Sequence, residues 1–206
     1  MAASLLAKGT TILSNVPHIE DVVVMVKILE TLGCKITGVG TSTLSIDTTN
    51  LKYHRVDPQL ATKVRASIVL LAPILARFGK VELGFPGGDV IGKRGVGTHF
   101  DVLTTLCVKF TNTPLVIKGQ LTDKPQKNIF LDEASVTATE NALIFATSIP
   151  HITTIENAAC EPHIIDLGQM LTKMGAKISG LGSNTITVSG STKLKSVTFS
   201  VGPDYI

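Results

Sequence analysis

The sequence predicts an α/β protein made of three similar units, each with the order helix, strand, helix, strand, strand. The first observation is an internal repeat, in which residues 32–40 (LGCKITGVG) match residues 174–182 (MGAKISGLG). The second is a strand pattern at residues 80–85 that is followed by a glycine-rich loop and a helical pattern. A long internal match is typical of repeat architectures, so we expect one domain with pseudo-threefold symmetry around a shared core.

The first unit, at about residues 1–60, is expected to begin with the end of a helix and to continue with a strand, a second helix and a hairpin. Gly9 and Gly33 are expected to stop the two helices, because glycine favours the backbone conformation found at helix C-termini. Alternation of apolar and polar residues predicts the strands. The expected bounds are a helix end at 1–9, a strand at 10–13, a helix at 19–32 and a hairpin of 35–37 with 43–46.

The second unit, at about residues 61–132, is the most divergent. Pro73 lies inside its first helix and predicts a kink there. Cys107 stands where the other units have Gly33 and Gly175, so either this helix ends differently or Cys107 adopts a left-handed backbone conformation. The expected bounds are a helix at 62–77, a strand at 80–85, a helix at 98–107 and a hairpin of 115–118 with 128–131.

The third unit, at about residues 133–206, is expected to open with a helix at 135–148 and a strand at 152–156. Pro17-His18-Ile19 matches Pro162-His163-Ile164, which predicts that the second helix of this unit is about one turn shorter than that of the first. The brief opening helix and the absence of a terminating element after Gly202 indicate that both ends are cut from a longer chain.

Composition argues against several classes of function. The net charge of +3, the absence of tryptophan and the lack of basic runs disfavour nucleic acid as a partner. No apolar stretch is long enough for a membrane span, and no basic leader of a signal peptide is present, so we expect a cytoplasmic protein. The three cysteines and five histidines show no metal-ligand spacing, so neither a metal nor an organic cofactor is expected.

The loop at residues 86–99 has the composition of an anion-binding site. It contains five glycines, the cations Lys93 and Arg94, and the carboxylate of Asp89. Glycines let a ligand approach the backbone N–H groups, and the start of the following helix favours negative charge. Arg94 adds a guanidinium that can hold a phosphate or carboxylate through two hydrogen bonds. A glycine-rich surface turn without a ligand is the alternative.

The same loop partly matches the phosphate-binding loop of nucleotide triphosphatases. Gly87, Gly92 and Lys93 have the spacing of that motif. Arg94, however, stands where serine or threonine should hold magnesium, and no apolar strand ending in aspartate completes a metal site. We therefore regard a triphosphatase as a distant alternative.

Together with the repeat, the loop gives the chain a resemblance to the enolpyruvyl transferases that covers essentially all 206 residues. It is similar above all to the members that act on UDP-N-acetylglucosamine in bacterial cell-wall synthesis. The resemblance implies one domain at residues 1–206, folded as an inside-out α/β barrel of three repeats, with a second domain of the same parent chain missing. The segments that carry the resemblance are residues 65–67, 76–79, 86–94, 135–141 and 155–162.

The resemblance also implies an activity and its residues. The enolpyruvyl group of phosphoenolpyruvate would pass to the 3-hydroxyl of UDP-N-acetylglucosamine, and phosphate would leave. Asp89 would act as the general acid, in the position where most members carry a fosfomycin-sensitive cysteine. Arg94 would hold the phosphate of phosphoenolpyruvate. The residues implied in substrate binding are Arg65, Arg94, Gly95, Val96, Gly97, Thr98, Glu133, Ala134, Ser135 and Val136.

Several residues leave room for other interpretations. Arg65 could be a solvated surface charge, and Ser135 could simply cap a helix. Four residues depart from the family pattern, so the contacts to the sugar nucleotide stay open. They are Gly95, Gly97, Glu133 and Thr137, the last of which stands where the family pattern has glycine. The isolated chain is expected to fold without catalysing the reaction. The alternative functions are an enolpyruvyl transferase for shikimate phosphate and a non-catalytic sugar-nucleotide-binding domain.

Overall fold

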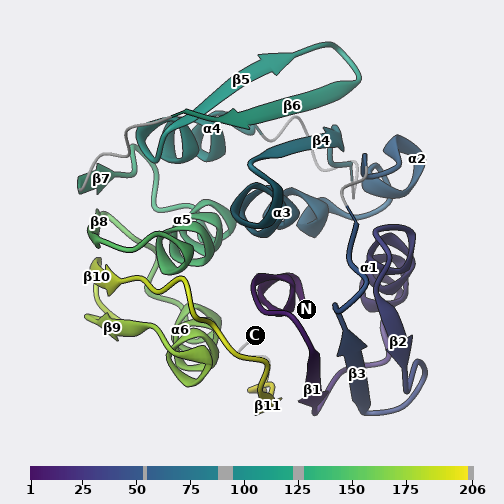
Figure 1. Cartoon of the computed structure of the whole chain (residues 1–206). Coiled ribbons are helices and arrows are strands. Elements are labelled where there is room, and N and C mark those ends of the chain that lie inside the picture. The colour runs from purple at the N-terminus through teal and green to yellow at the C-terminus, as the bar shows by residue number, and fades with distance from the viewer. Residues whose placement is uncertain (53–54, 88–94, 123–127, 204–206) are drawn as a thin grey trace.

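The computed structural model of the chain describes residues 1–52, 55–87, 95–122 and 128–203. Figure 1 shows three small sheets at the outside of the molecule, with helices packed between them. This is an α/β arrangement, as the sequence predicts. The element order helix, strand, helix, strand, strand occurs three times along the chain.

The first unit follows the expected order closely. The carboxylates of Glu20 and Asp21 lie in the first turn of its long helix, where they interact favourably with the positive end of the helix dipole. The opposite end stops at Gly33, which has a φ of 100°. The elements are η1, a 3-10 helix (Ala2–Leu6), β1 (Thr10–Ser14), α1 (Glu20–Thr31), β2 (Lys35–Thr37) and β3 (Thr43–Asp47).

The second unit differs from the prediction in its first helix. The chain forms a 3-10 helix and changes to α geometry at Leu71, so that Pro73 lies in the first turn of the α-helix. A proline in the first turn leaves no α-helical hydrogen bond unmade, so no kink is needed there. The elements are α2 (Pro58–Ala61), η2 (Arg65–Leu70), α3 (Leu71–Phe78), β4 (Lys80–Gly84), α4 (Gly97–Thr105), β5 (Val108–Asn112), β6 (Val116–Leu121) and β7 (Asn128–Phe130).

Two further expectations for this unit are decided by the backbone. The predicted hairpin of residues 115–118 with 128–131 is wrong, because β5 pairs with β6 in an antiparallel hairpin that starts earlier. Residues 113–115 connect the two strands of this hairpin, and the sequence pattern did not lead us to predict this short connection. Cys107 does adopt a left-handed conformation, with a φ of 73°, at the position that glycine occupies in the other units.

The third unit contains the most buried helix. The elements are α5 (Val136–Ser148), β8 (Ile152–Glu156), α6 (Pro162–Met174), β9 (Lys177–Ser179), β10 (Thr185–Ser189) and β11 (Thr198–Ser200). Nine of the ten residues of α5 from Ala138 to Thr147 are buried, and Glu140 is the exception. α5 contacts α3, α4 and α6, so it forms the middle of the core.

Strand registers correct the match between the first and third units. Leu13 pairs with Leu44 in one sheet, and Ile155 pairs with Ile186 in the other. Leu13 therefore corresponds to Ile155, one residue away from the pairing that the sequence suggested. At this offset α1 and α6 start at equivalent positions and have 12 and 13 residues. The prediction of a shorter helix in the third unit is wrong.

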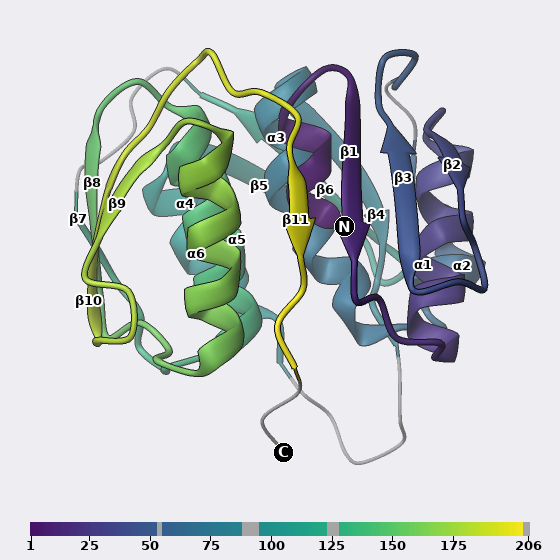
Figure 2. The ribbon, with the colours of Figure 1, turned by 90° about the horizontal axis from the view of Figure 1, so that it is seen from below.

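Each sheet is extended by a parallel partner that comes from another unit. β11 pairs with β1, β7 pairs with β8, and Val56 forms a single parallel bridge with Leu83 of β4. The segment after each hairpin thus joins the sheet of the next unit, and the last one returns to the first. Figure 2 shows β11 and β1 side by side. Within the described residues the three sheets stay separate and form no closed barrel.

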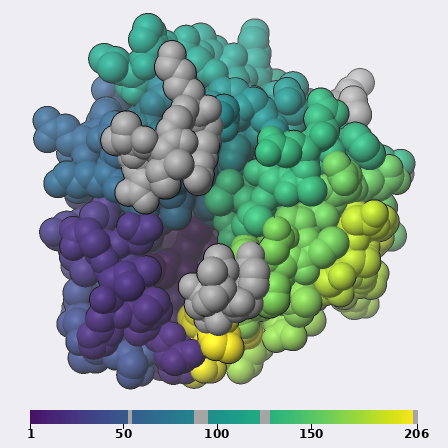
Figure 3. All heavy atoms as spheres, turned by 180° about the vertical axis from the view of Figure 1, so that it is seen from behind, coloured from purple at the N-terminus to yellow at the C-terminus, as the bar shows by residue number. Residues whose placement is uncertain are grey.

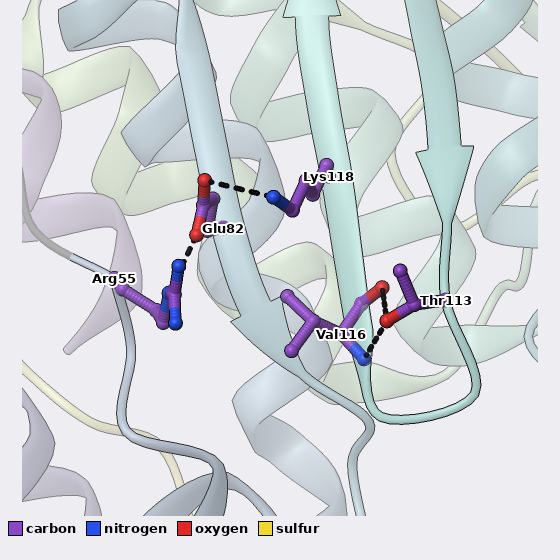
Figure 4. Close-up of polar contacts among 5 residues, drawn as sticks. All are labelled: Arg55, Glu82, Thr113, Val116 and Lys118. Carbon is purple, nitrogen blue, oxygen red and sulfur yellow. Dashed lines mark hydrogen bonds and ion pairs between the residues drawn. The ribbon is translucent and has the colours of Figure 1, made fainter.

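The junction between the first two units is held by backbone and side chains together. Val56 donates its N–H to the carbonyl of Glu82 at 2.9 Å. The Glu82 carboxylate lies between the guanidinium of Arg55, at 2.5 Å, and the ammonium of Lys118, at 3.4 Å (Figure 4). Desolvation alone would raise the pKa of Glu82, but the hydrogen bonds and charges of these two cations lower it below its usual value. Arg55 and Lys118 stay exposed, so we expect their two ion pairs with Glu82 to contribute little to stability.

The turn between β2 and β3 gives a testable prediction. Gly38 and Gly40 both have positive φ, 85° and 82°, but a Cβ added to Gly38 would lie 2.0 Å from the carbonyl oxygen of Thr43, whereas one added to Gly40 meets nothing within 4 Å. We expect Gly38→Ala to lower the free energy of unfolding by about 3 kcal/mol and Gly40→Ala by about 1 kcal/mol. Urea denaturation measures both, and equal losses would contradict the geometry.

Candidate functional site

Arg65 connects two of the predicted site segments. It is the first residue of η2, and its Nη2 donates a 2.7 Å hydrogen bond to the carbonyl oxygen of Gly95. The side chain is half-buried, so it is not a freely solvated surface charge. The guanidinium therefore holds the backbone that immediately precedes α4.

The segment of residues 95–98 forms the start of α4. Val96 occupies the N-cap position and accepts N–H groups from His99 and Phe100 at 3.2 and 3.3 Å. No side chain caps this helix, and Gly95 and Gly97 are exposed. The first N–H groups of a helix have no partner within the helix, so they are available to a ligand.

The segment of residues 133–136 leads into α5. Ser135 is the N-cap residue, and its Oγ accepts the N–H of Ala138 at 3.4 Å, as one of the two interpretations of the sequence expected. Its hydroxyl hydrogen is not used in that bond. Glu133 and Ala134 are exposed, while Ser135 and Val136 are half-buried. The α5 start is thus a second helix N-terminus that lies next to that of α4, because His99 in the first turn of α4 contacts Thr137 in the first turn of α5.

A buried polar cluster joins these two helix starts, and the sequence analysis missed it. His99 on α4 is 2% exposed. Its Nε2 lies 3.1 Å from Oγ1 of Thr137, and its Nδ1 lies 2.9 Å from Nδ2 of Asn141. Asn141 in turn binds the backbone of Ile68 and Ala72. The sequence does contain one signal for this cluster, namely a histidine and an asparagine on helical faces that are otherwise apolar.

The electrostatics of this cluster keep His99 uncharged. Burial and, to a smaller extent, the positive charge of Arg65 together lower the pKa of His99 to about 4. Glu140, next to Asn141 on α5, shows the opposite behaviour: burial raises its pKa to about 7, partly offset by the positive N-terminal amine. Both groups therefore favour their neutral forms in the folded protein.

These two groups predict an unusual dependence of stability on pH. Between pH 4.5 and 6.5, an unfolded chain protonates His99 while the folded one does not, so this group lowers stability as pH falls. The folded chain protonates Glu140 in the same range, which raises stability as pH falls. We expect Glu140→Gln to lose about 1.4 kcal/mol more stability per pH unit than the wild type between pH 6 and 5. Equal slopes in the two proteins, measured by urea denaturation, would contradict this.

The remaining predicted residues, Asp89 and Arg94, lie outside the described residues. Gly87 is the last described residue before them, and its N–H is donated to the carbonyl of Ala61 at 3.3 Å. A Cβ on Gly87 would lie 1.8 Å from the carbonyl oxygen of Thr62. Only glycine therefore lets the chain pass the turn that follows α2. The structure brings together the other predicted residues, from Arg65 and the starts of α4 and α5.

Other features of the described residues do not add to this site. A cavity of about 180 Å³ lies in the first unit, between the loop before α1 and the β2–β3 turn, and contains none of the predicted residues. Among the described residues, no group of three or more histidine, cysteine, aspartate or glutamate side chains could hold a metal ion. None of the described helices is long and apolar enough to cross a membrane.

The family is decided by comparison with known proteins. The sequence profile described as EPSP synthase (3-phosphoshikimate 1-carboxyvinyltransferase) matches residues 1–206. The chain belongs to the EPSP synthase family. This agrees with the resemblance to enolpyruvyl transferases in the sequence, and a phosphate-loop triphosphatase is no longer a useful alternative.

Within the EPSP synthase family, the chain is similar to curated proteins named UDP-N-acetylglucosamine 1-carboxyvinyltransferase. It is 45% identical to that of Treponema denticola over 212 residues, which cover 100% of this chain and 48% of the relative. It is 43% identical to that of Borreliella burgdorferi over 204 residues, with 99% and 48% covered. The chain thus spans about half the length of the curated relatives it matches.

Solved structures of the EPSP synthase family share the fold. The enolpyruvyl transferase NikO from Streptomyces tendae superposes with a TM-score of 0.84 at 20% identity, over 98% of this chain and 48% of that one. An EPSP synthase from Acinetobacter baumannii gives a TM-score of 0.70, also at 20% identity, over 97% and 47%. At this identity the likeness shows the α/β fold and does not indicate a substrate.

Proposed function

We propose that this chain is the loop-bearing part of an enzyme that transfers the enolpyruvyl group of phosphoenolpyruvate to the 3-hydroxyl of UDP-N-acetylglucosamine. Phosphate is released, and the product enters peptidoglycan synthesis. The observation that carries the proposal is the 45% identity, over the whole chain, to a protein named for the carboxyvinyl transfer to this sugar nucleotide. The proposed location of the enzyme is the cytoplasm.

The arrangement of the described residues supports a site for a negatively charged nucleotide sugar. Two helix N-termini lie side by side at Val96 and Ser135, and Arg65 adds a positive charge beside the first of them. Free N–H groups, helix dipoles and a guanidinium all favour phosphate oxygens. In the proposal, residues 95–98 and 133–136 bind the nucleotide sugar together with Arg65.

In this mechanism the loop supplies the proton and a second anion contact. Asp89 protonates the methylene carbon of phosphoenolpyruvate, so that the sugar hydroxyl can add at the neighbouring carbon. The sugar hydroxyl gives its proton to a carboxylate base of the second domain, and the new methyl group then loses a proton, which restores the carbon–carbon double bond as the phosphate held by Arg94 leaves. Lys93 and Arg94 favour the ionised form of Asp89, and the substrate's phosphate and carboxylate offset these cations, so that Asp89 carries its proton when the ligand is bound. An aspartate in this position also makes the enzyme insensitive to fosfomycin, which alkylates a thiol.

The proposal includes a second domain of the same parent chain. The three units form an inside-out barrel with pseudo-threefold symmetry, and the parallel pairing of each unit with the next supports this view. The second domain closes over the loop and completes the site. Figure 3 shows one face of the present chain, with the first unit in purple on one side and the third in green on the other.

A chimera tests the proposal. Residues 1–206 replace the matching region of the Treponema denticola relative, and release of phosphate from phosphoenolpyruvate is measured. We expect release with UDP-N-acetylglucosamine and none with shikimate 3-phosphate. The isolated chain should bind UDP-N-acetylglucosamine without releasing phosphate. A folded chimera that binds the nucleotide sugar but releases no phosphate would favour a non-catalytic binding domain and overturn the proposal.

A further inference from the structure

The amide of Asn141 has only one orientation that satisfies its backbone partners. Its Oδ1 accepts the N–H of Ala72 at 3.1 Å, and its Nδ2 donates to the carbonyl of Ile68 at 3.1 Å. A backbone N–H can only donate and a carbonyl can only accept, so exchanging the oxygen and nitrogen would break both bonds. The group that faces His99 is therefore the donor Nδ2, at 2.9 Å.

This orientation fixes the tautomer of His99. Because Nδ2 of Asn141 only donates, Nδ1 of His99 must accept and carries no proton. The neutral ring then carries its proton on Nε2, which donates to Oγ1 of Thr137 at 3.1 Å. The burial that lowers the pKa of His99 to about 4 agrees with a neutral ring. The chain of donors runs from Asn141 through His99 to Thr137.

The end of this donor chain lies at the proposed substrate site. Thr137 is the second residue of α5 and is half-buried. Its oxygen accepts from His99, so its hydroxyl hydrogen remains for another partner. His99 lies in the first turn of α4, so its ring connects the start of α4 to the start of α5 through Thr137.

We propose that His99 is a positioning residue that locks the start of α4 to the start of α5 and turns the Thr137 hydroxyl into a donor for the diphosphate of the nucleotide sugar. This rests on the proposed function, because it takes the substrate from there. A neutral, oriented hydroxyl next to two helix N-termini adds a directional bond to a site that otherwise attracts anions mainly by charge. A threonine at this position thus supplies a contact that glycine, the residue of the family pattern, cannot.

Nitrogen NMR of the histidine rings tests the lock in the isolated chain, without ligand. We expect His99 to show a proton on Nε2, none on Nδ1, and no protonation until the pH approaches 4. In Asn141→Asp, an acceptor replaces the donor, and the proton should move to Nδ1. A wild-type ring with its proton on Nδ1, or one that titrates near 6.5, would overturn the lock.

Titration with UDP-N-acetylglucosamine and with uridine tests the donor. Thr137→Val removes the hydroxyl at constant shape, and we expect it to weaken binding of the nucleotide sugar about tenfold or more while leaving uridine unchanged. Thr137→Ser keeps the hydroxyl and should bind within about twofold of the wild type. Thr105→Val is the control, because Thr105 lies on the same helix as His99 and, in the described part of the chain, its hydroxyl donates only to the carbonyl of Asp101.

The outcomes separate this inference from the proposed function. Equal affinity of the wild type and Thr137→Val for the nucleotide sugar would overturn the donor role and leave the proposed function intact. A wild-type chain that binds phosphoenolpyruvate but not UDP-N-acetylglucosamine would overturn the proposed substrate, and with it the donor role. The nitrogen spectrum decides the lock in either case.

Discussion

Asn141→Ala is expected to lower the free energy of unfolding by about 4 kcal/mol, the largest loss that we expect from one side chain in this chain. Asn141 is fully buried and holds three groups at once: the N–H of Ala72, the carbonyl of Ile68 and the ring of His99. Truncation leaves all three in the core without this partner, and each costs roughly 1–3 kcal/mol when unsatisfied.

Urea denaturation at pH 7 measures this loss. Asn184→Ala is the matched control, because Asn184 is exposed and, within the described residues, its side chain has a hydrogen bond only from the neighbouring Thr185. We expect the control to change stability by less than about 0.5 kcal/mol. Losses of similar size in the two variants would mean that the polar cluster does not organise the core between η2, α3, α4 and α5.

Asp89→Asn is expected to lower the rate of phosphate release about 1,000-fold in the chimera, because an amide cannot deliver the proton that the reaction needs. Binding of UDP-N-acetylglucosamine should stay within about threefold of the wild type, since the proposed nucleotide contacts come from other residues. Steady-state phosphate release with both substrates measures the effect. Asp101→Asn, an exposed carboxylate on α4, should leave the rate unchanged.

The same position predicts the response to a covalent inhibitor. Asp89→Cys introduces the thiol that the resemblance implies for most enolpyruvyl transferases of this kind, so we expect the variant to retain activity and to become sensitive to fosfomycin. The parent chimera should remain insensitive at the same concentration. An Asp89→Asn variant with full activity, or an Asp89→Cys variant that the drug does not inhibit, would mean that Asp89 is not the general acid.

Much of the fold could be predicted from the sequence because its strongest signals are local. Gly33 and Gly175 mark equivalent helix ends, and Gly38 and Gly180 mark equivalent turns, so the repeat was visible in two units. The exact strand register could not be predicted, because Leu13 and its neighbours pair with a strand that lies far away in the sequence. The short sequence match at Pro17 and Pro162 was misleading for the same reason.

The site was predictable only in part. Arg65 and Ser135 follow from the resemblance, and their hydrogen bonds place them at helix starts that lie together. His99 and Asn141 were missed, because a single polar residue on an apolar helical face gives no hint of its partner on another helix. Their significance depends on tertiary contact, which periodicity cannot supply.

The pairing of β1 with β11 also has a consequence for how the chain is made. Asn15, directly after β1, binds the carbonyl of Val201 across 186 residues. At the usual pace of a ribosome, about 5–20 residues per second, the partner of the first strand is synthesised roughly 10–40 seconds after it. Until then the outer edge of β1 is open to strands from other nascent chains. We therefore expect the binding of chaperones to the nascent chain to depend more on the open edge of β1 than on the strands of the later units.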